Sequence, residues 1–348
     1  MYHFVMGKMH KFVIGLIVVL TVLSPGGLPN PAMAANDPGT AEIIKEAQKE
    51  GKVVMYTTFT LTDAMAFVEK FQKKYPFLKV DLHRLNNTQI LTRVFAEQRA
   101  KKPAVDVITC KGDTIYFMQK SGLLGKYLSP ERKFYADGFK DKEGYWTDVY
   151  PTVHCVVYNT RMVAPQDVPV TYQDLLKPRW KGKIGVNPNN YMWQAVILQT
   201  LGKEAGLKYL EALSRQNPIV RVGGTLNIML TAAGEMAMAV SVNANLVEKE
   251  KAKQAPVDWA RIKPYYGDLH PIALTAHPLH PNAGKLLIDY FLSQEGQELM
   301  VDLGNVPARK GLKSKIVRSE EVIPIDPALG EQMEYYQKLM KQTFVKKL

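Results

Sequence analysis

Short apolar segments alternate with amphipathic helical segments along most of this chain, and polar turns separate them. The first apolar segment, Lys52–Tyr56, is rich in β-branched residues and is typical of a buried strand. The turn Thr57–Thr62 is rich in hydroxyls, and Ala64–Phe71 then has apolar residues at helical spacing. A second strand follows at Leu78–Leu82. This order predicts an α/β fold with mostly parallel sheets flanked by helices.

The pattern is interrupted twice, and each interruption is a predicted crossing between two lobes. The first lies in Tyr145–Tyr158, where the apolar residues favour extended segments, and the second lies in Val257–Tyr266. An amphipathic helix is predicted at the C-terminal end, Glu331–Lys346. Further strands are expected at Ala104–Cys110, Ile184–Val186, Pro218–Val222, Glu235–Val242 and Ile272–Ala276. A chain of 348 residues is long enough for two such α/β domains.

The first 34 residues have the features of an export signal. Lys8 and Lys11 precede Phe12–Leu23, an apolar run that is short for a membrane span. Ala32-Met33-Ala34 then fits a small-x-small cleavage site. We therefore expect cleavage after Ala34 and release into the periplasm, with a retained signal anchor as the alternative.

The chain carries a net charge of +12, and two of these charges lie in the leader. A surplus of this size fits either a lysine-rich solvated surface or an anionic ligand or partner. The basic residues are spread along the chain without a dense basic arm or a recognised nucleic-acid motif. Nucleic acid is therefore not an expected partner.

The two cysteines, Cys110 and Cys155, leave three possibilities open. In an exported protein they could form one disulfide, but each lies in an apolar run where buried free thiols are common. Either thiol could also serve as a nucleophile, since Cys155 follows His154. Because no accompanying catalytic motif is present, the sequence favours a protein that is not an enzyme.

Seven segments together carry a resemblance to a known family. The chain resembles the iron-type, family 1 extracellular solute-binding proteins of ABC importers, over nearly all of the mature sequence as far as Lys310. The segments are EGKVVMYTTF (50–59), FQKKYPFLKV (71–80), AVDVI (104–108), VVYNTRMV (156–163), LLKPRWKGKIGV (175–186), AAGEMAMAVSVNAN (232–245) and YFLSQEGQELM (290–300).

This resemblance implies the type II fold of periplasmic binding proteins, in which two lobes joined by two crossovers close on a ligand. It implies an ABC permease of the inner membrane as the partner, a small molecule or ion as the ligand, and a monomer without a cofactor. Lobe 1 is expected to comprise residues 35–150 and 265–348, and lobe 2 residues 151–264. A cleft between the lobes would lie at the carboxyl ends of strands.

The ferric members of this family have an adjacent tyrosine pair after the strand that matches Glu235–Val242. The matching positions here read Val242-Asn243-Ala244-Asn245, without a tyrosine. Neutral amide side chains suit an oxyanion or a small anionic or polar organic ligand better than bare Fe(III). Such a ligand, or ferric iron with a synergistic anion, is therefore expected. A ferric-binding protein proper and a thiol enzyme are the alternatives, and metal ligands are left open.

Polar residues that follow the strands are the candidate ligand contacts, because helix starts offer N–H groups to anions. Simple helix capping is the competing interpretation. Lys111 could neutralise an anion, Asp268 and His270 could supply ligands or hold a loop, and His154 is expected to be a surface or core residue. The candidates are Thr58, Phe59, Asn87, Thr88 and Lys111 in lobe 1, Asn190, Tyr191, Thr225 and Asn243 in lobe 2, and Tyr266 near the return crossover.

Overall fold

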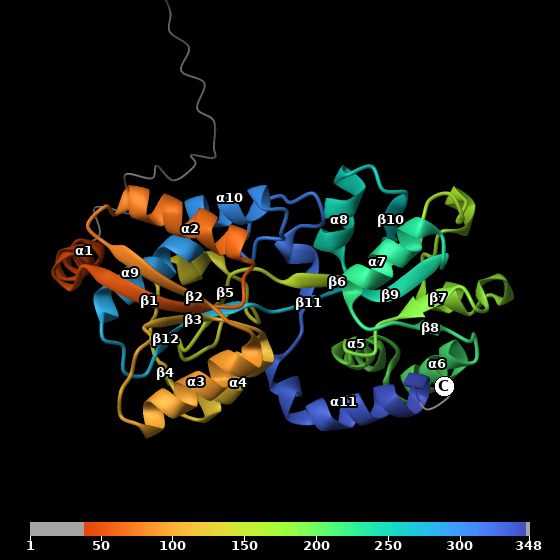
Figure 1. The fold of residues 1–348 in the computed structure, drawn as a ribbon, viewed down its shortest axis with the longest axis horizontal. Coiled ribbons are helices and arrows are strands. Elements are labelled where there is room, and N and C mark those ends of the chain that lie inside the picture. Colours follow the sequence, from red (N-terminus) through yellow and green to blue (C-terminus); the bar gives the residue numbers. More distant parts are fainter. Residues whose placement is uncertain (1–37, 346–348) are drawn as a thin grey trace, which may run out of the picture. The chain divides into compact units, whose positions relative to one another are not determined.

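The computed structural model describes residues 38–345, which contain two β-sheets covered by helices (Figure 1). Residues from Glu42 onward form one compact unit. The predicted leader and its cleavage site after Ala34 lie outside the described residues. Within residues 38–345, no helix has both the length and the apolarity that crossing a membrane requires.

The first sheet has the strand order β2-β1-β3-β12-β4, and β5 also pairs with β12. Figure 1 shows α3 and α4 on one side of this sheet, and α2, α9 and α10 on the other. Its strands are β1 (Lys52–Thr57), β2 (Lys79–Arg84), β3 (Val107–Thr109), β4 (Leu124–Gly125), β5 (Thr147–Asp148) and β12 (Pro271–Thr275). The helices in this part of the chain are α1 (Pro38–Glu50), α2 (Leu61–Lys74), α3 (Asn87–Arg99), α4 (Gly112–Lys120), α9 (Pro281–Leu292) and α10 (Gln294–Asp302).

The second sheet has the order β13-β11-β6-β9-β7-β8, and β10 also pairs with β6. Its strands are β6 (Thr152–Asn159), β7 (Ile184–Val186), β8 (Ile219–Val220), β9 (Met238–Asn243), β10 (Val257–Ala260), β11 (Tyr265–Asp268) and β13 (Val322–Pro324). The helices here are α5 (Met192–Leu201), α6 (Lys203–Ser214), α7 (Gly224–Ala233), α8 (Ala244–Ala252) and α11 (Met333–Met340). Helices α7 and α8 lie on the side opposite to α5, α6 and α11 (Figure 1).

The predicted α/β architecture is confirmed, but the expectation of mostly parallel sheets is wrong. In the first sheet β1 runs parallel to β2 and β3, whereas β12 runs antiparallel to β3, β4 and β5. In the second sheet β6 runs antiparallel to β9, β10 and β11. Strands joined by a helix become parallel, as expected. The antiparallel pairs all involve β6 or β12, each of which follows a strand of the other sheet without an intervening helix.

Local sequence explains where the first helices begin and which face they bury. Thr60 caps α2 by accepting a hydrogen bond from the Asp63 backbone N–H at 3.1 Å. Asn86 and Gln89 form a reciprocal capping box at the start of α3. The apolar face of α2 is buried as predicted, and its members are Ala64, Phe67, Val68 and Phe71.

The chain passes between the sheets at two short connections, and once more through the longer segment between α10 and β13. It leaves the first sheet at β5 and enters the second at β6, and it returns from β11 to β12. Between these strands lie only Val149–Pro151 and Leu269–His270. The two connections lie side by side, because β6 pairs with β11 through Thr152 and Asp268.

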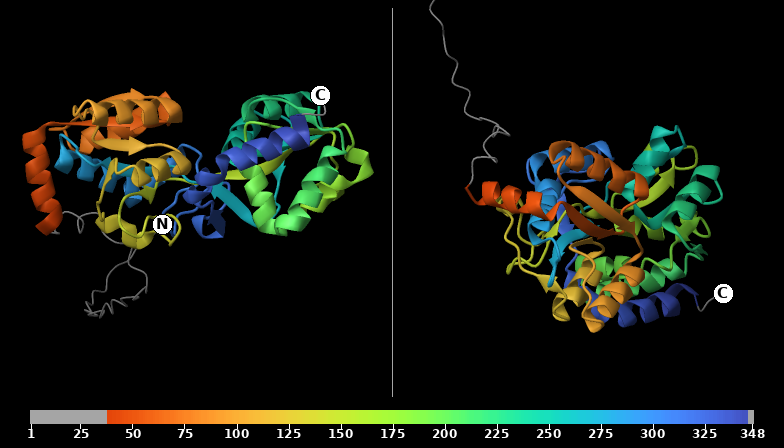
Figure 2. Two further views of the ribbon diagram at one scale, coloured as in Figure 1. Left: turned by 90° about the horizontal axis from the view of Figure 1, so that it is seen from below. Right: turned by 60° about the vertical axis from the view of Figure 1, so that its left-hand side comes forward.

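The C-terminal segment is not confined to the first sheet, so the assignment of all of residues 265–348 to lobe 1 does not describe it. Strand β13 pairs with β11, and the short 3-10 helix η7 (Pro327–Gln332) then packs against α4. Helix α11 contacts α5, and Figure 2 shows it beside the helices of the second sheet in both views. Apolar residues explain this placement, because Tyr336, Met340 and Phe344 are buried in the same cluster as Trp193.

Candidate functional site

A carboxylate at the end of β11 lies between a lysine from the first sheet and a histidine from the second. Asp268 Oδ2 is 3.0 Å from His154 Nε2 and 3.5 Å from Lys111 Nζ. Lys111 directly precedes α4, and His154 lies on β6. The side chains of Asp268 and His154 are 11% and 5% exposed, whereas that of Lys111 is 44% exposed. The cluster of Lys111, His154 and Asp268, here called the junction cluster, therefore opens to solvent on the lysine side.

Asn190 fixes the tautomer of His154. Its Nδ2 atom is 3.0 Å from His154 Nδ1 and also donates to the Ser241 carbonyl oxygen at 3.1 Å. An amide N–H group can only donate, so Nδ1 of the imidazole accepts and its proton lies on Nε2. The Nε2–H group therefore faces Asp268 Oδ2, which is 3.0 Å away.

The charges of this cluster follow from its contacts. Burial acts to raise the pKa of Asp268, but its contacts with His154 and Lys111 outweigh burial and hold that pKa below its usual range. The Asp268 charge in turn raises the pKa of Lys111 against the opposing effect of burial. Burial lowers the pKa of His270 to about 4, and its ring stacks on Tyr150 with centroids 4.5 Å apart. At neutral pH the cluster contains an ammonium, a carboxylate and an uncharged His270.

A cavity of about 20 Å³ adjoins Lys111 and Asp268. Such a volume holds about one water molecule, so a larger ligand can enter only if the surrounding elements move apart. The cavity is lined by the start of α4, by the end of β11 and by the segment between β13 and η7. The lining residues are Lys111, Gly112, Asp113, Met192, Asp268, Leu269, Ile325, Asp326 and Pro327.

Five of the ten candidate ligand residues lie in or next to this cluster. Asn87 Oδ1 accepts a hydrogen bond from the Lys111 backbone N–H at 3.1 Å, which joins the start of α3 to the residue before α4. Asn190 contacts His154 directly, and Asn243 is the backbone partner of His154 in the β6–β9 ladder. Tyr191 precedes α5, and burial together with the nearby Asp113 raises its pKa.

The other five candidates lie elsewhere or are occupied by packing. Phe59 is 3% exposed and its ring contacts the rings of Phe67, Tyr150 and Phe291, so it belongs to the core. Tyr266 is 8% exposed and packs in the second hydrophobic cluster, two residues before Asp268.

The three threonines retain side chains at least partly open to solvent. Thr58 bonds through its backbone N–H to the Thr109 carbonyl oxygen, so it lies where β1 and β3 end. Thr88 and Thr225 are exposed in the first turns of α3 and α7. A direct role of any of the ten residues in ligand contact stays a prediction.

Sequence reasoning left Asp268 and His154 out of the candidate set, although they form the centre of the cluster. His154 lies within an apolar run, where a core or surface role is the simpler interpretation. Its partner is 114 positions away along the chain, and Lys111 is 157 positions from Asp268. The sequence did contain one signal for Asp268: it is the last residue of a strand, just as Lys111 lies shortly after the end of another strand.

The ligand set of a metal site was left open, and the residues in 38–345 contain no group of three or more His, Cys, Asp or Glu side chains placed to hold a metal ion. At the position of the ferric family's tyrosine pair, Asn243 ends β9. Asn245 Nδ2 donates to Asn305 Oδ1 at 2.9 Å. The amide of Asn245 is therefore engaged within the protein.

Both cysteines are free and buried, which excludes the disulfide between them. Burial raises the thiol pKa of Cys110 and of Cys155, so neither is a thiolate near neutral pH. His154 and Cys155 are adjacent on a strand, so their side chains point to opposite faces of the sheet. This arrangement does not give Cys155 the adjacent base that a nucleophile needs.

We expect neither thiol to react with iodoacetamide in the folded protein at pH 8, because the reactive thiolate is suppressed and access is blocked. Mass spectrometry should find both cysteines unmodified in native protein and both modified in guanidinium chloride. Fast native labelling of Cys155 would instead support the thiol-enzyme alternative.

The fold, with two sheets joined by short connections, is that of the two-lobe binding proteins. The chain belongs to the bacterial extracellular solute-binding protein family, which residues 102–326 match. A curated relative of undetermined function from Haemophilus influenzae is 25% identical over 275 residues, covering 73% of this chain and 76% of the relative. A Fe(3+)-binding periplasmic protein of Serratia marcescens is 28% identical over 78 residues, or 22% of this chain and 23% of that protein.

Solved structures support the fold. Iron-bound HitA from Pseudomonas aeruginosa matches 84% of this chain and 99% of its own, with a TM-score of 0.72 and 18% identity. AfuA from Actinobacillus pleuropneumoniae, with fructose-6-phosphate bound, matches 85% of this chain and 99% of its own, with a TM-score of 0.66 and 20% identity. Similar folds thus hold iron in one case and a phosphorylated sugar in another.

Proposed function

We propose that this protein is the periplasmic binding component of an ABC importer and captures a small anionic organic ligand between its two sheets. It would deliver this ligand to an inner-membrane permease as a monomer, without catalysing a reaction. The supporting observation is the junction cluster, where Lys111 contributes a positive charge that stays partly open to solvent. Lys111 also lies at the start of α4, where helix N–H groups and the macrodipole favour an anion.

Ferric iron with a synergistic anion is the second candidate ligand, and the iron-binding proteins among the relatives favour it. Bare Fe(III) needs several anionic oxygen ligands. The cluster supplies one carboxylate, Asp268, which is already paired with two partners. Tyr266, two residues before Asp268, is buried by packing. An anion that supplies further oxygen ligands would complete the coordination of iron better than the protein alone.

A thermal-shift panel separates these ligands. We expect phosphate esters, phosphonates or carboxylates to raise the melting temperature of the mature protein, and ferric iron to do so only with an anion. A ligand at one hundred times its dissociation constant adds about 2.7 kcal/mol. For a chain of this length that is a shift of several degrees. The largest shift with ferric iron alone, accompanied by a tyrosinate charge-transfer band in the visible spectrum, would overturn the proposal.

Lys111→Gln should weaken the binding of one anion, the one that gives the largest thermal shift. The affinity should fall by about tenfold or more, because the substitution removes a charge-assisted contact. Titration calorimetry of the purified protein measures this change. Lys120→Gln is the matched control, since Lys120 ends the helix that Lys111 precedes and has a side chain that is 63% exposed. Equal affinity in Lys111→Gln and wild type would place the anion elsewhere.

A further inference from the structure

A second, larger cavity lies in the first sheet's half of the protein, away from the junction cluster. Its volume is about 400 Å³. It is lined by residues that precede β3 and follow β12, whereas Lys111 follows β3. At about 3.3 Å per strand residue, Val105 and Lys111 lie roughly 20 Å apart. The cavity and the junction cluster therefore occupy opposite ends of the same sheet. Its lining comprises Val94, Glu97, Gln98, Lys101, Pro103, Val105, Leu123, Thr275, Ala276 and His277.

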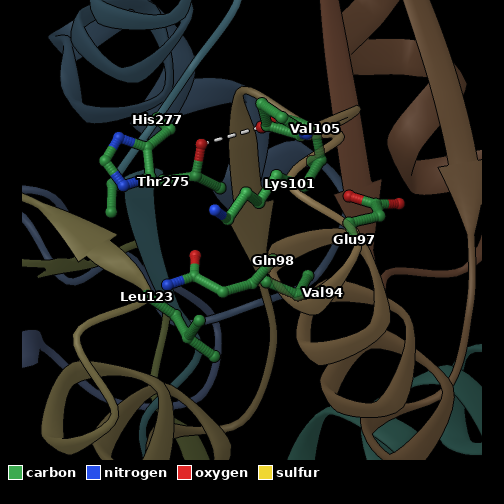
Figure 3. Close-up of a pocket in the computed structure, with 10 residues that line it drawn as sticks. Val94, Glu97, Gln98, Lys101, Val105, Leu123, Thr275 and His277 are labelled. Carbon is green, nitrogen blue, oxygen red and sulfur yellow. Dashed lines mark hydrogen bonds between the residues drawn. The ribbon is translucent and has the colours of Figure 1, made fainter.

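The cavity has an apolar floor and a polar rim. Val94, Val105 and Leu123 are buried and present side chains to the floor. Figure 3 shows the Lys101 amine and the Gln98 amide extending from the α3 side toward His277 on the opposite wall. A ligand with an apolar body and one polar end would match this division.

The rim of the cavity carries a positive charge, which Lys101 contributes. Among the ion pairs of residues 38–345, Lys101 has no carboxylate partner. The nearby Glu97 is already engaged, since it accepts from Tyr56 Oη at 2.6 Å, Arg93 Nε at 3.2 Å and the Ala104 backbone N–H at 3.3 Å. Figure 3 shows its carboxylate turned away from the Lys101 amine. Lys101 is thus available to an anion.

The backbone at Lys101 adopts a conformation that glycine normally provides. Its φ is +53°, and it follows α3 as the residue after the C-cap. The N–H groups of Lys101 and Lys102 bond to the carbonyl oxygens of Gln98 and Glu97, each at 3.0 Å, which is the pattern of a Schellman turn. A lysine here is less favourable than glycine for the backbone. The turn does, however, direct the lysine side chain along the cavity.

We infer that this cavity is a second binding site, which takes a small apolar carboxylate. The anionic head would accept hydrogen bonds from the Lys101 ammonium, the Gln98 amide and a His277 ring N–H. The apolar body would cover Val94, Val105 and Leu123, which removes apolar surface from water. Thr275 is not free for the head group, because its Oγ1 donates to the Val105 carbonyl oxygen at 2.7 Å.

Fluorine NMR with 4-fluorobenzoate as the probe tests this site, and 4-fluorobenzamide serves as its uncharged counterpart of the same shape. We expect the carboxylate to bind wild-type protein at least about tenfold more tightly than the amide, which corresponds to the loss of one charge-assisted contact. Equal binding of the two probes, or binding of neither, would overturn the inference.

Lys101→Gly is the decisive variant, because glycine suits the positive φ of this position and the fold should be as stable as wild type or more so. Its affinity for 4-fluorobenzoate should fall to that for the amide, while its melting temperature stays equal or rises. Lys102→Ala is the matched control, since it removes the same charge from the next residue, which does not line the cavity, and should bind as wild type does.

Lys111→Gln distinguishes this site from the junction cluster and from the proposed function. We expect it to leave 4-fluorobenzoate binding unchanged, and Lys101→Gly to leave the importer ligand's affinity unchanged. If Lys111→Gln abolishes 4-fluorobenzoate binding and Lys101→Gly does not, the probe binds in the junction cluster and the second site is rejected. If no tested anion binds at the junction cluster, that result would count against the proposed function alone.

Discussion

Asp268→Asn is expected to destabilise the protein by about 2 kcal/mol at pH 7 while tightening the binding of a purely anionic ligand. Stability falls because the substitution removes the one carboxylate that contacts both His154 and Lys111 in a largely buried site. Anion affinity rises because the carboxylate both repels the ligand and occupies the cation that would bind it. Denaturant unfolding measures the first effect and calorimetry measures the second. Weaker anion binding in Asp268→Asn would show that the carboxylate helps to hold the ligand.

The stability effect of Asp268 has a defined pH dependence. The pKa of Asp268 is lower in the folded protein than its unfolded value of about 3.9. The ionised carboxylate therefore contributes its full stabilisation above about pH 5, and this contribution is lost as the pH falls through the folded pKa. The difference in the free energy of unfolding between wild type and Asp268→Asn should be constant near neutral pH and should decrease below about pH 4. Asp258→Asn is the control, because its partner Lys251 is at the surface and such pairs contribute under about 1 kcal/mol.

Gln297→Leu is expected to cost about 4 kcal/mol, the largest stability change among these variants. Gln297 is fully buried in α10, and its Nε2 donates to the carbonyl oxygens of Val149 and Phe291 at 2.9 and 3.0 Å. Its Oε1 accepts from the backbone N–H groups of Ala308 and Arg309 at 2.9 and 3.1 Å. Leucine would remove all four hydrogen bonds from a buried site, at about 1 kcal/mol each, and the Ala308 N–H would keep only its 3.3 Å bond to the Val149 carbonyl oxygen.

Thermal unfolding should show this loss as a decrease of roughly 8 °C in the melting temperature, at about 2 °C per kcal/mol for a chain of this length. Gln294→Leu is the matched control on the same helix. The side chain of Gln294 donates to the exposed Glu298, so this substitution should change stability by about 0.5 kcal/mol or less. Equal melting temperatures of Gln297→Leu and Gln294→Leu would show that the buried hydrogen bonds of Gln297 contribute nothing to stability.

The local part of the fold could be predicted from sequence because its causes are local. Apolar spacing defined α2, and hydroxyl and amide side chains marked the helix starts near Thr60 and Asn86. The direction of β12 could not be predicted in this way, since it depends on the passage from the second sheet back to the first. Antiparallel pairing of Ile272 with Thr109 joins residues far apart in the chain.

The candidate site was predicted in part for the same reason. Lys111 and Asn190 were found because each follows a strand, and the carboxyl ends of strands collect ligand sites. The pairing of His154 with Asp268 depends on the register of β6 with β11, which no local pattern encodes. Both residues also fit ordinary core or loop roles. The burial of Tyr266 could not be predicted from sequence either, since its hydrophobic cluster includes residues of the C-terminal segment.

That C-terminal segment affects how the chain can fold as it is made. The second hydrophobic cluster includes Ile325, Tyr336, Met340 and Phe344, and the first sheet needs β12 between β3 and β4. Neither half can therefore complete its core from a nascent chain that lacks the final quarter of its residues. Pairings of such long sequence separation form slowly. The protein should remain unfolded until synthesis is nearly finished, a state that a translocation channel for unfolded chains can accept.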